Sequence, residues 1–358
     1  MLVDLDYFYA QCEERRNPSI RGKPVVVSVY SGRTEDSGVV STANYLAREY
    51  GVRSGIPISV AKNRLKGVDA VFLPVDHVFY DEVSEKVMMV LHGYVDRFER
   101  VGIDEAYLDV TERAKGDFGT ATEIARSIKE EVHTQLGLTC SIGIGPNKLI
   151  AKIAADVNKP DGLTVVKPKV LQEFLHPLPV GSLIGVGRKT EDKLRALGMG
   201  TIGDLAQSNE KTLIDVFGQK LGSYFHKAAN GIDSTPVQER GEALSISRIS
   251  TLREDTHDLK AVVELSERLC DEIHSRLVEA NLSFMSITAI AITRDLTIHT
   301  KSKTLDGPTD RIEVLRGTAT QLFGKLLDEW ELPLRRAGVR VSGLTKIETP
   351  NRRLTDFT

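Results

Sequence analysis

The spacing of hydrophobic and polar residues predicts an ordered series of elements in the first half of the chain. Apolar side chains recur every three or four residues in two segments, as on one face of a helix. In other segments they alternate with polar side chains, as in a strand. The predicted elements are a strand at 1–6, a helix at 78–98, strands at 99–103 and 106–110, a helix at 118–136 and a strand at 139–145. This β-α-β-β-α-β order predicts a ferredoxin-like module.

The rest of the sequence divides into further modules. Residues 11–76 interrupt the ferredoxin-like order after its first strand and form an inserted subdomain. Short helices broken by glycine cover 167–233, and the polar stretch 234–243 has no apolar period, which predicts a tether. Strands and two long helices alternate again over 244–345, and a polar tail, 346–358, follows. We therefore predict a multidomain α+β protein.

Composition narrows the class of protein. The chain has 358 residues, enough for about two to four domains, and its 41% hydrophobic and 27% charged residues are typical of globular proteins. No apolar run approaches the length of a membrane span, and no secretory leader is recognisable. The three cysteines are far apart and form no CxxC pair, which argues against a disulfide framework and a cysteine zinc site. We expect a reduced, cytoplasmic protein.

Charge is unevenly distributed within 244–345, although the net charge of the chain is only −3. The predicted helix that begins near residue 255 is mainly acidic. The predicted strands carry the cations Arg248, Lys301, Lys303, Arg336 and Arg340. A sheet with a basic face backed by acidic helices would attract a nucleic-acid backbone. An ordinary solvated sheet face explains the same charges equally well.

Four carboxylates are candidates for metal chemistry. Asp4 and Asp6 lie two apart on the first strand and so share a face, whereas Asp104 and Glu105 lie where two predicted strands meet. The first and third strands of a ferredoxin-like module are neighbours, so Asp4 should converge with the second pair. Clustered carboxylate oxygens favour Mg²⁺ or Mn²⁺, and two such ions are typical of nucleotidyl transfer. The alternative is that Asp4 caps an edge strand and the second pair forms a polar turn.

Polar and aromatic residues near these carboxylates suggest a nucleotide site. Tyr9 follows the first strand closely enough to stack on a sugar, although a packed aromatic cluster explains such a run as well. Thr42, Tyr45 and Arg48 recur every three residues near a predicted helix start, a combination suited to a triphosphate. Lys159, in a tight loop, would add a positive charge, but lysines in loops are usually just solvated.

A glycine hairpin lies between two predicted helices of 167–233. Gly185 and Gly187 leave backbone amides free to meet a phosphate, and Arg188 and Lys189 follow directly. This pattern resembles the helix-hairpin-helix module, which binds the DNA backbone without reading sequence. It is not a dinucleotide-binding fingerprint, because the preceding strand and the third glycine are missing.

Several motifs together resemble the Y family of translesion DNA polymerases, most closely its archaeal DNA polymerase IV (DinB-type) class. The motifs are Asp4-x-Asp6-x-Phe8-Tyr9-Ala10-x-x-Glu13, Ser41-Thr42-Ala43-Asn44-Tyr45-x-Ala47-Arg48, Ser54-Gly55-Ile56-Pro57, Ile103-Asp104-Glu105-Ala106-Tyr107-Leu108-Asp109 and Asn147-Lys148-x-x-Ala151-Lys152-x-Ala154-Ala155. The likeness runs in register from Met1 to about Leu344. It implies a palm (1–10 and 77–166), inserted fingers (11–76), a helix-hairpin-helix thumb (167–233), a linker (234–243) and a DNA-binding little finger (244–345).

The resemblance also implies roles for individual residues. Asp4, Asp104 and Glu105 match the metal-binding carboxylates, together with the backbone oxygen of Leu5, and Glu105 matches the catalytic carboxylate nearest the primer 3′-hydroxyl. Tyr9 matches the steric gate that excludes ribose. The implied nucleotide contacts are Phe8, Tyr9, Thr42, Tyr45, Arg48 and Lys159, and the implied surface over the nascent base pair is Gly38, Val39 and Gly55. The implied DNA contacts are Gly185, Gly187, Arg188, Lys189 and the five strand cations.

The two ends of the chain depart from the family pattern. The strand before Asp4 is shorter than the family's usual lead, which leaves open whether the native start lies upstream. In the tail, Leu354 and Phe357 have the spacing of a sliding-clamp-binding peptide. An asparagine stands there for the usual glutamine, and a threonine for the second aromatic. Clamp binding through this tail is an expectation that follows from the resemblance.

We predict a monomeric, template-directed, low-fidelity DNA polymerase for translesion synthesis. It would add deoxynucleoside triphosphates to a primer with two Mg²⁺ ions, or with Mn²⁺ in their place. A nucleotide cyclase with a similar palm and an inactive DNA-binding scaffold are the alternatives. The hairpin and the basic strands argue against the cyclase, and the intact carboxylates argue against the scaffold. Lesion preference and error spectrum do not follow from the sequence.

Overall fold

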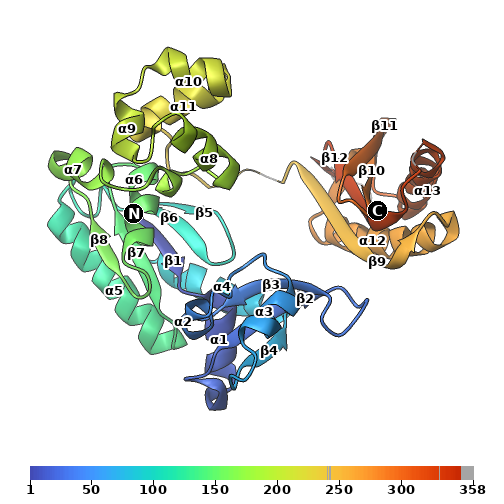
Figure 1. Ribbon diagram of the computed structural model, residues 1–358, viewed down its shortest axis with the longest axis horizontal. Coiled ribbons are helices and arrows are strands. Elements are labelled where there is room, and N and C mark those ends of the chain that lie inside the picture. The colour runs from blue at the N-terminus through green and yellow to red at the C-terminus, as the bar shows by residue number, and fades with distance from the viewer. Residues whose placement is uncertain (240, 242, 330, 348–358) are drawn as a thin grey trace, which may run out of the picture. The chain divides into compact units, whose positions relative to one another are not determined.

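The computed structural model describes residues 1–239, 241, 243–329 and 331–347 (Figure 1). The chain divides into two compact units, one formed by residues 1–29 and 39–240 and the other by residues 30–38 and 241–358. None of the helices in the described part of the chain is long and apolar enough to cross a membrane. Each unit is described separately below.

A five-stranded sheet carries the first unit. Its strands are β1 (Leu2–Leu5), β5 (Arg97–Arg100), β6 (Glu105–Asp109), β7 (Cys140–Ile144) and β8 (Leu163–Val165). Their order in the sheet is β5-β6-β1-β7-β8, and β1 pairs antiparallel with both β6 and β7. The first four strands have the predicted ferredoxin-like order, and β8 extends the sheet in parallel with β7.

Helices cover both faces of this sheet (Figure 1). They are α1 (Phe8–Arg16), α4 (His77–His92), α5 (Phe118–Leu136) and α6 (Lys148–Val157). Apolar side chains of α4 and α5 pack in one core with Val3 and Leu5 of β1. The alternate residues of β1 point to the other face, where Leu2 packs with Tyr107 and with Ala151 and Ala155 of α6. Asp4 shares that face, so the alternation of β1 directs its carboxylate toward α6.

The segment inserted after α1 forms a second, smaller sheet. Its strands are β2 (Val25–Tyr30), β3 (Gly38–Ala43) and β4 (Val71–Pro74), in the order β3-β2-β4. The helical elements beside it are a 3₁₀ turn (Pro18–Ile20), α2 (Tyr45–Glu49) and α3 (Ile58–Arg64). A separate small core joins β2 and β3 to α2 and α3. The structure therefore gives this insertion its own core, as expected from the sequence.

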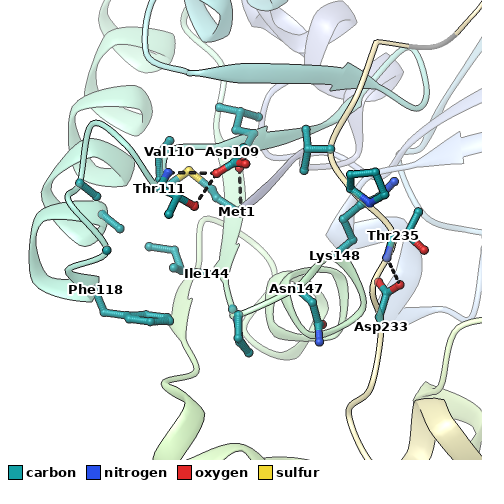
Figure 2. Close-up of a pocket in the computed structure, with 18 of the residues that line it drawn as sticks. Met1, Asp109, Val110, Thr111, Phe118, Ile144, Asn147, Lys148, Asp233 and Thr235 are labelled. Atoms are coloured by element: carbon teal, nitrogen blue, oxygen red, sulfur yellow. Dashed lines mark hydrogen bonds between the residues drawn. The ribbon is translucent and has the colours of Figure 1, made fainter.

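Short helices follow β8 and end at a segment that packs on the five-stranded sheet. They are a 3₁₀ turn (Pro168–Val170), α7 (Leu171–Leu175), a 3₁₀ turn (Val180–Ser182), α8 (Arg188–Ala196), α9 (Ile202–Gln207), α10 (Glu210–Phe217) and α11 (Gln219–Ala229). Asp233 then accepts a hydrogen bond from the amide of Leu149, and the amide of Gln238 donates to Glu99. Between them, the segment borders a cavity of about 480 Å³ beside Met1 and Asp109 (Figure 2). The predicted tether is thus anchored as far as Gln238.

The second unit is a sheet with two long helices on one face. Its elements are β9 (Ser245–Thr256), α12 (Leu259–Glu279), β10 (Leu282–Thr293), β11 (Ile298–Thr309), α13 (Ile312–Glu329), β12 (Leu334–Ser342) and β13 (Thr345–Lys346). The main order is β11-β10-β12-β9, and β13 pairs with the start of β10. The apolar sides of α12 and α13 pack on alternate residues of the strands, for example Ala289 and Val339. The predicted succession of strands and helices is confirmed here.

Candidate active site

Three carboxylates meet at the centre of the five-stranded sheet. Asp4 on β1 is the cross-strand partner of Glu105 on β6, and the amide of Leu5 donates to the carbonyl of Asp104 at 2.8 Å. All three acidic residues line one cavity of about 500 Å³. The predicted convergence of Asp4 with the Asp104–Glu105 pair is therefore confirmed, because the antiparallel register places opposite residues on the same face.

A lysine that the sequence analysis did not assign stands among these carboxylates. Lys152 Nζ lies 3.0 Å from Oδ2 of Asp4 and also donates to Glu105. Lys152 belongs to α6, whose other inward residues, such as Ile153 and Ala154, are buried and apolar. Lys148 and Lys152 lie four residues apart on one side of an otherwise largely apolar helix, and this was the available signal for acidic partners on the sheet.

The carboxylates repel one another, and the lysines offset that repulsion. Burial raises the pKa of Asp104, and the negative charges of Asp4 and Glu105 raise it further. Burial opposes the charge on Lys152, but Asp4 and Glu105 outweigh it and raise the pKa of that amine. Lys159, predicted as a triphosphate contact, places Nζ 2.7 Å from Oδ1 of Asp4. Two ammonium groups therefore stand where an oxygen-ligated cation would be held.

The donor set fits a hard divalent cation, although the side chains are turned toward the lysines. Among the described residues, no three acidic, histidine or cysteine side chains are arranged to hold a metal ion as they stand. The oxygens of Asp4, Asp104 and Glu105 are nevertheless the ligand type that Mg²⁺ and Mn²⁺ prefer. The mutual repulsion that raises the pKa of Asp104 is what a cation would relieve.

Asp6 does not join this cluster, contrary to the prediction that it shares the face of Asp4. β1 ends at Leu5, and the Asp6 carboxylate is buried. It accepts hydrogen bonds from the hydroxyls of Thr139 and Ser141 and from the amide of Asp161, at 2.7–2.9 Å. Asp161 lies two residues after Lys159, so Asp6 anchors the turn that carries this lysine.

The opposite wall of the cavity comes from the inserted sheet and α2. The predicted residues Thr42, Tyr45 and Arg48 all line it. The Arg48 guanidinium lies 4.6 Å from the centroid of the Tyr45 ring, and its Nε donates to the carbonyl of Ala43 at 2.9 Å. These two contacts orient Arg48 before any ligand binds. Two further residues of this wall, Arg53 and Ser54, were missed by the sequence analysis although they precede the predicted Gly55 directly.

The N-terminus of α1 also borders the cavity. Tyr7 adopts a left-handed backbone conformation (φ 35°, ψ 45°), and no side chain caps the helix. Phe8, the first residue of α1, also lines the cavity although the residue is only 2% exposed. The free amides of an uncapped helix start are a ready site for a phosphate group. Strain at Tyr7 is the conformational cost of placing that start next to β1.

Tyr9, on the first turn of α1, lies near Asp104. It is half-buried and stacks on Tyr80 of α4. Burial raises the pKa of Tyr9, and the negative charge of Asp104 adds to this. The predicted steric-gate residue therefore lies close to the carboxylate cluster.

In the predicted surface for the nascent base pair, the segments that carry Val39 and Gly55 are paired through their backbones. Val39 is 46% exposed and pairs with Pro57, and the amide of Gly55 donates to the carbonyl of Val40. Gly55 has φ +86°, a conformation that favours glycine, and nothing lies within 4 Å of the position of a Cβ atom. Gly38 is the first residue of β3.

The glycine hairpin forms the start of α8. Gly185 has φ +86°, and Gly187 is the N-terminal flanking residue of this helix. Arg188 and Lys189 occupy its exposed first turn. The hairpin glycines and the two cations are therefore exposed side by side, as the helix-hairpin-helix pattern predicts.

The cations of the second unit do not share one face of its sheet. Arg248 pairs in register with Val339 and Lys301 with Ala289, both core residues, so these cations lie on the helix side. Lys303 lies opposite Ile287 and shares that side. Arg248 contacts Glu272 of α12 at 3.1 Å, and Lys301 contacts Glu329 of α13 at 2.6 Å. The expectation of a single basic face is corrected by this register.

Arg336 and Arg340 lie on the other face, together with many hydroxyls. Arg340 is the register partner of Thr288 and Ser247, and Arg336 that of Thr251. The remaining hydroxyl residues of this face are Ser245, Ser286, Thr300, Ser302, Thr304 and Ser342. A face of hydroxyls with two arginines is suited to phosphate oxygens. The predicted clamp contacts Leu354 and Phe357 lie outside the described residues.

Three family models match successive parts of this sequence. The impB/mucB/samB family matches residues 3–156, its C-terminal domain residues 243–355, and the DNA polymerase-iota thumb domain residues 181–233. The chain is 46% identical to DNA polymerase IV of Nitrosopumilus maritimus over 96% of its own length and 95% of that protein.

Solved structures of DNA polymerases are also similar to this chain. The fold is similar to a Y-family DNA polymerase chimera, with a TM-score of 0.91 and 36% identity over 97% of this chain and 99% of the chimera. It is also similar to an insertion ternary complex of Dbh DNA polymerase, with a TM-score of 0.70 and 36% identity over 97% and 99% of the two chains.

Proposed function

The chain belongs to the Y family of DNA polymerases, the impB/mucB/samB family, and from this premise we propose a template-directed, two-metal mechanism of low fidelity. As a DNA-directed DNA polymerase, the enzyme acts on primer–template DNA and deoxynucleoside triphosphates. The observation that carries the proposal is the register of Asp4 opposite Glu105, with Asp104 beside them, in one cavity. The domain roles are those of a palm (1–10, 77–166), fingers (11–76), thumb (167–233) and little finger (244–345).

Asp4, Asp104 and Glu105, with the backbone oxygen of Leu5, would hold two divalent cations, Mg²⁺ or Mn²⁺. The chemistry that such cations supply is a lower pKa of the primer hydroxyl and stabilisation of charge on the transferring phosphoryl group. Lys152 would have to leave Asp4 and Glu105 to free their oxygens. Glu105 is assigned to the primer side of the site, at the edge nearest the 3′-hydroxyl.

The triphosphate would lie between the palm and the inserted sheet. Arg48 and Lys159 supply positive charge, Thr42 and Tyr45 supply hydroxyls, and the uncapped start of α1 at Phe8 supplies backbone amides. These groups are held by other contacts before the substrate arrives, so little conformational entropy is lost on binding. The chain's contribution to catalysis is thus mainly positioning.

Sugar and base selection would use residues that flank the cavity and do not line it. Tyr9, beside Asp104, is assigned to the ring of the incoming sugar, where a 2′-hydroxyl would collide with it. The surface over the nascent base pair would consist of small side chains, those of Gly38, Val39 and Gly55. Such a surface would make few contacts with the base pair, so a mispaired or damaged base would meet little steric hindrance. Low fidelity and tolerance of damaged templates follow from that sparse surface.

DNA would be held mainly through its phosphates. The hairpin around Gly185 and Gly187, with Arg188 and Lys189, offers amides and cations to the backbone. In the second unit, Arg336 and Arg340 with the surrounding hydroxyls are the preferred contacts, because Arg248 and Lys301 are paired with helix carboxylates. A sliding clamp bound through Leu354 and Phe357 remains a proposal from the sequence alone.

Primer extension on a template with an abasic site tests the proposed function. Wild-type protein with Mg²⁺ should extend past the abasic position, and extension should require both template and divalent cation. A protein that binds primer–template but adds no nucleotide under any divalent cation would contradict it. Synthesis of a cyclic nucleotide without DNA would instead favour the cyclase alternative.

A further inference from the structure

The Tyr9 ring lies flat against another aromatic ring, that of Tyr80. The two ring centroids are 4.2 Å apart, with 15° between their planes, and the Tyr80 side chain is fully buried. His77, also on α4, meets the Tyr9 ring edge-on at 6.3 Å. The first turn of α4 therefore supports one face of a ring that belongs to the first turn of α1.

Tyr80 is itself fixed by a buried carboxylate of α1. Its hydroxyl donates to Oε1 of Glu13 at 2.8 Å, and Glu13 is only 8% exposed. Glu13 follows Tyr9 by four residues, so both side chains lie on the same side of α1 and both contact Tyr80. Burial and the bond to Glu13 raise the pKa of Tyr80, which keeps its hydroxyl a donor at all physiological pH values.

A second set of contacts keeps Glu13 in place. Nη1 of Arg16 lies 3.7 Å from Glu13 and 2.9 Å from Asp76. Asp76 caps α4 by accepting a hydrogen bond from the amide of Phe79. The starts of α1 and α4 are thus tied together by a chain of polar contacts that ends at the Tyr80 hydroxyl.

The Tyr9 ring depends on this support. Within the described part of the chain, its hydroxyl has no hydrogen-bond partner, so ring stacking is what limits rotation of the side chain. Steric exclusion of a 2′-hydroxyl needs a wall that does not move away when pushed. A ring free to tilt would admit the ribose at a small energetic cost.

From this geometry we infer that Tyr80 is a positioning residue for sugar selection, held by Glu13, that keeps Tyr9 in place as a rigid wall. The inference rests on the proposed role of Tyr9 as steric gate. Tyr80 does not touch the substrate in this arrangement, since it is fully buried behind Tyr9. It acts on the ribose-to-deoxyribose ratio only through the ring in front of it.

The test compares kcat/KM for one ribonucleotide and its deoxynucleotide opposite one template base. Tyr80→Leu removes the stacked ring and should raise the ribose-to-deoxyribose ratio about three- to tenfold. This factor is the rate ratio that corresponds to the interaction energy of one aromatic pair. Tyr80→Phe keeps the ring but loses the hydrogen bond to Glu13, so it should raise the ratio measurably but by less than Tyr80→Leu does. Glu13→Ala should match Tyr80→Phe, and the double variant should not exceed either, because both remove one hydrogen bond.

The matched control is Tyr94→Leu. Tyr94 follows α4, and its hydroxyl donates to Glu131 of α5, so this variant also loses a tyrosine ring and a tyrosine–glutamate bond. It should lower the melting temperature without moving the ratio. A ratio that rises equally in Tyr94→Leu would show a general loosening of the palm and would overturn the inference.

Tyr9→Ala separates failure of the inference from failure of the proposed gate. If Tyr9→Ala raises the ratio by orders of magnitude and Tyr80→Leu leaves it unchanged, the gate stands and the support by Tyr80 is refuted. If Tyr9→Ala does not move the ratio, the gate assignment itself fails. Should Tyr80→Leu not fold, Tyr80→Phe and Glu13→Ala decide the question, because unchanged ratios in both would refute the anchoring by Glu13.

Discussion

Lys152 Nζ lies 3.0 Å from Oδ2 of Asp4, on the face of the palm sheet that α6 covers. The same ammonium group donates to Glu105, and Lys159 approaches the other oxygen of Asp4. The fold thus balances its own carboxylates with side-chain cations when no other cation is bound. We therefore expect the stability of the first unit to depend on divalent metal, which melting temperatures can measure.

Lys152→Met should destabilise the metal-free protein and be rescued by metal. Without the ammonium, the carboxylates of Asp4 and Glu105 repel each other uncompensated, at a cost of about 1–2 kcal/mol for a partly buried site. The melting temperature in EDTA should fall by about 2–8 °C. Mg²⁺ or Mn²⁺ should raise it more in the variant than in wild type, because the cation replaces the missing positive charge.

Lys148→Met is the matched control for this measurement. Lys148 contacts the buried Glu99 at 2.6 Å but lies outside the carboxylate cavity. Its loss should lower the melting temperature equally with and without divalent metal. If Lys152→Met behaves in the same metal-independent way, Lys152 does not act as the counter-charge of the carboxylates.

Asp104→Ala or Glu105→Ala should reduce primer extension by at least about a thousandfold, since each removes a proposed metal ligand. Binding of primer–template should change little, because the phosphate contacts that we propose lie in residues 167–233 and 244–345. Asp109→Asn, at the far end of the same strand β6, is the control and should extend normally. Extension near the wild-type rate in either alanine variant would contradict the two-metal assignment.

Asp6→Ala tests whether a buried carboxylate positions Lys159. The variant leaves the donors of Thr139, Ser141 and Asp161 without their acceptor, which should cost about 1–3 kcal/mol of stability per buried donor left unpaired. The turn that carries Lys159 would loosen, and KM for the deoxynucleotide should rise more than kcat falls. Ser141→Ala removes one of the three hydrogen bonds and should show a smaller effect in the same direction. An unchanged KM in Asp6→Ala would mean that the turn holds its shape without this anchor.

The sequence predicted the strand order and the meeting of Asp4 with Glu105, because hydrophobic periodicity defines the strands and the ferredoxin-like order determines which strands are neighbours. It misplaced Asp6, since a two-residue spacing implies a shared face only while the strand continues, and β1 ends at Leu5. It missed the roles of Lys152 and Tyr80, because the residues that they contact are far away in the sequence. The faces of Arg248 and Lys301 likewise depend on register with β12 and β10, which local patterns do not determine.

The last prediction concerns which face of the little-finger sheet meets DNA. Arg336 and Arg340 lie opposite the helices, and Nε of Arg336 is buried without a hydrogen-bond partner among the described residues. If these arginines neutralise phosphates, Arg336→Ala with Arg340→Ala should reduce the log–log salt slope of DNA affinity by about 0.9 for each phosphate that is no longer neutralised. Arg248→Ala with Lys301→Ala removes the same charge from the helix side, where Glu272 and Glu329 already neutralise it, and should leave the slope nearly unchanged. A larger reduction of the slope in this second pair would place the DNA on the helix side of the sheet, because only released counterions contribute to the slope.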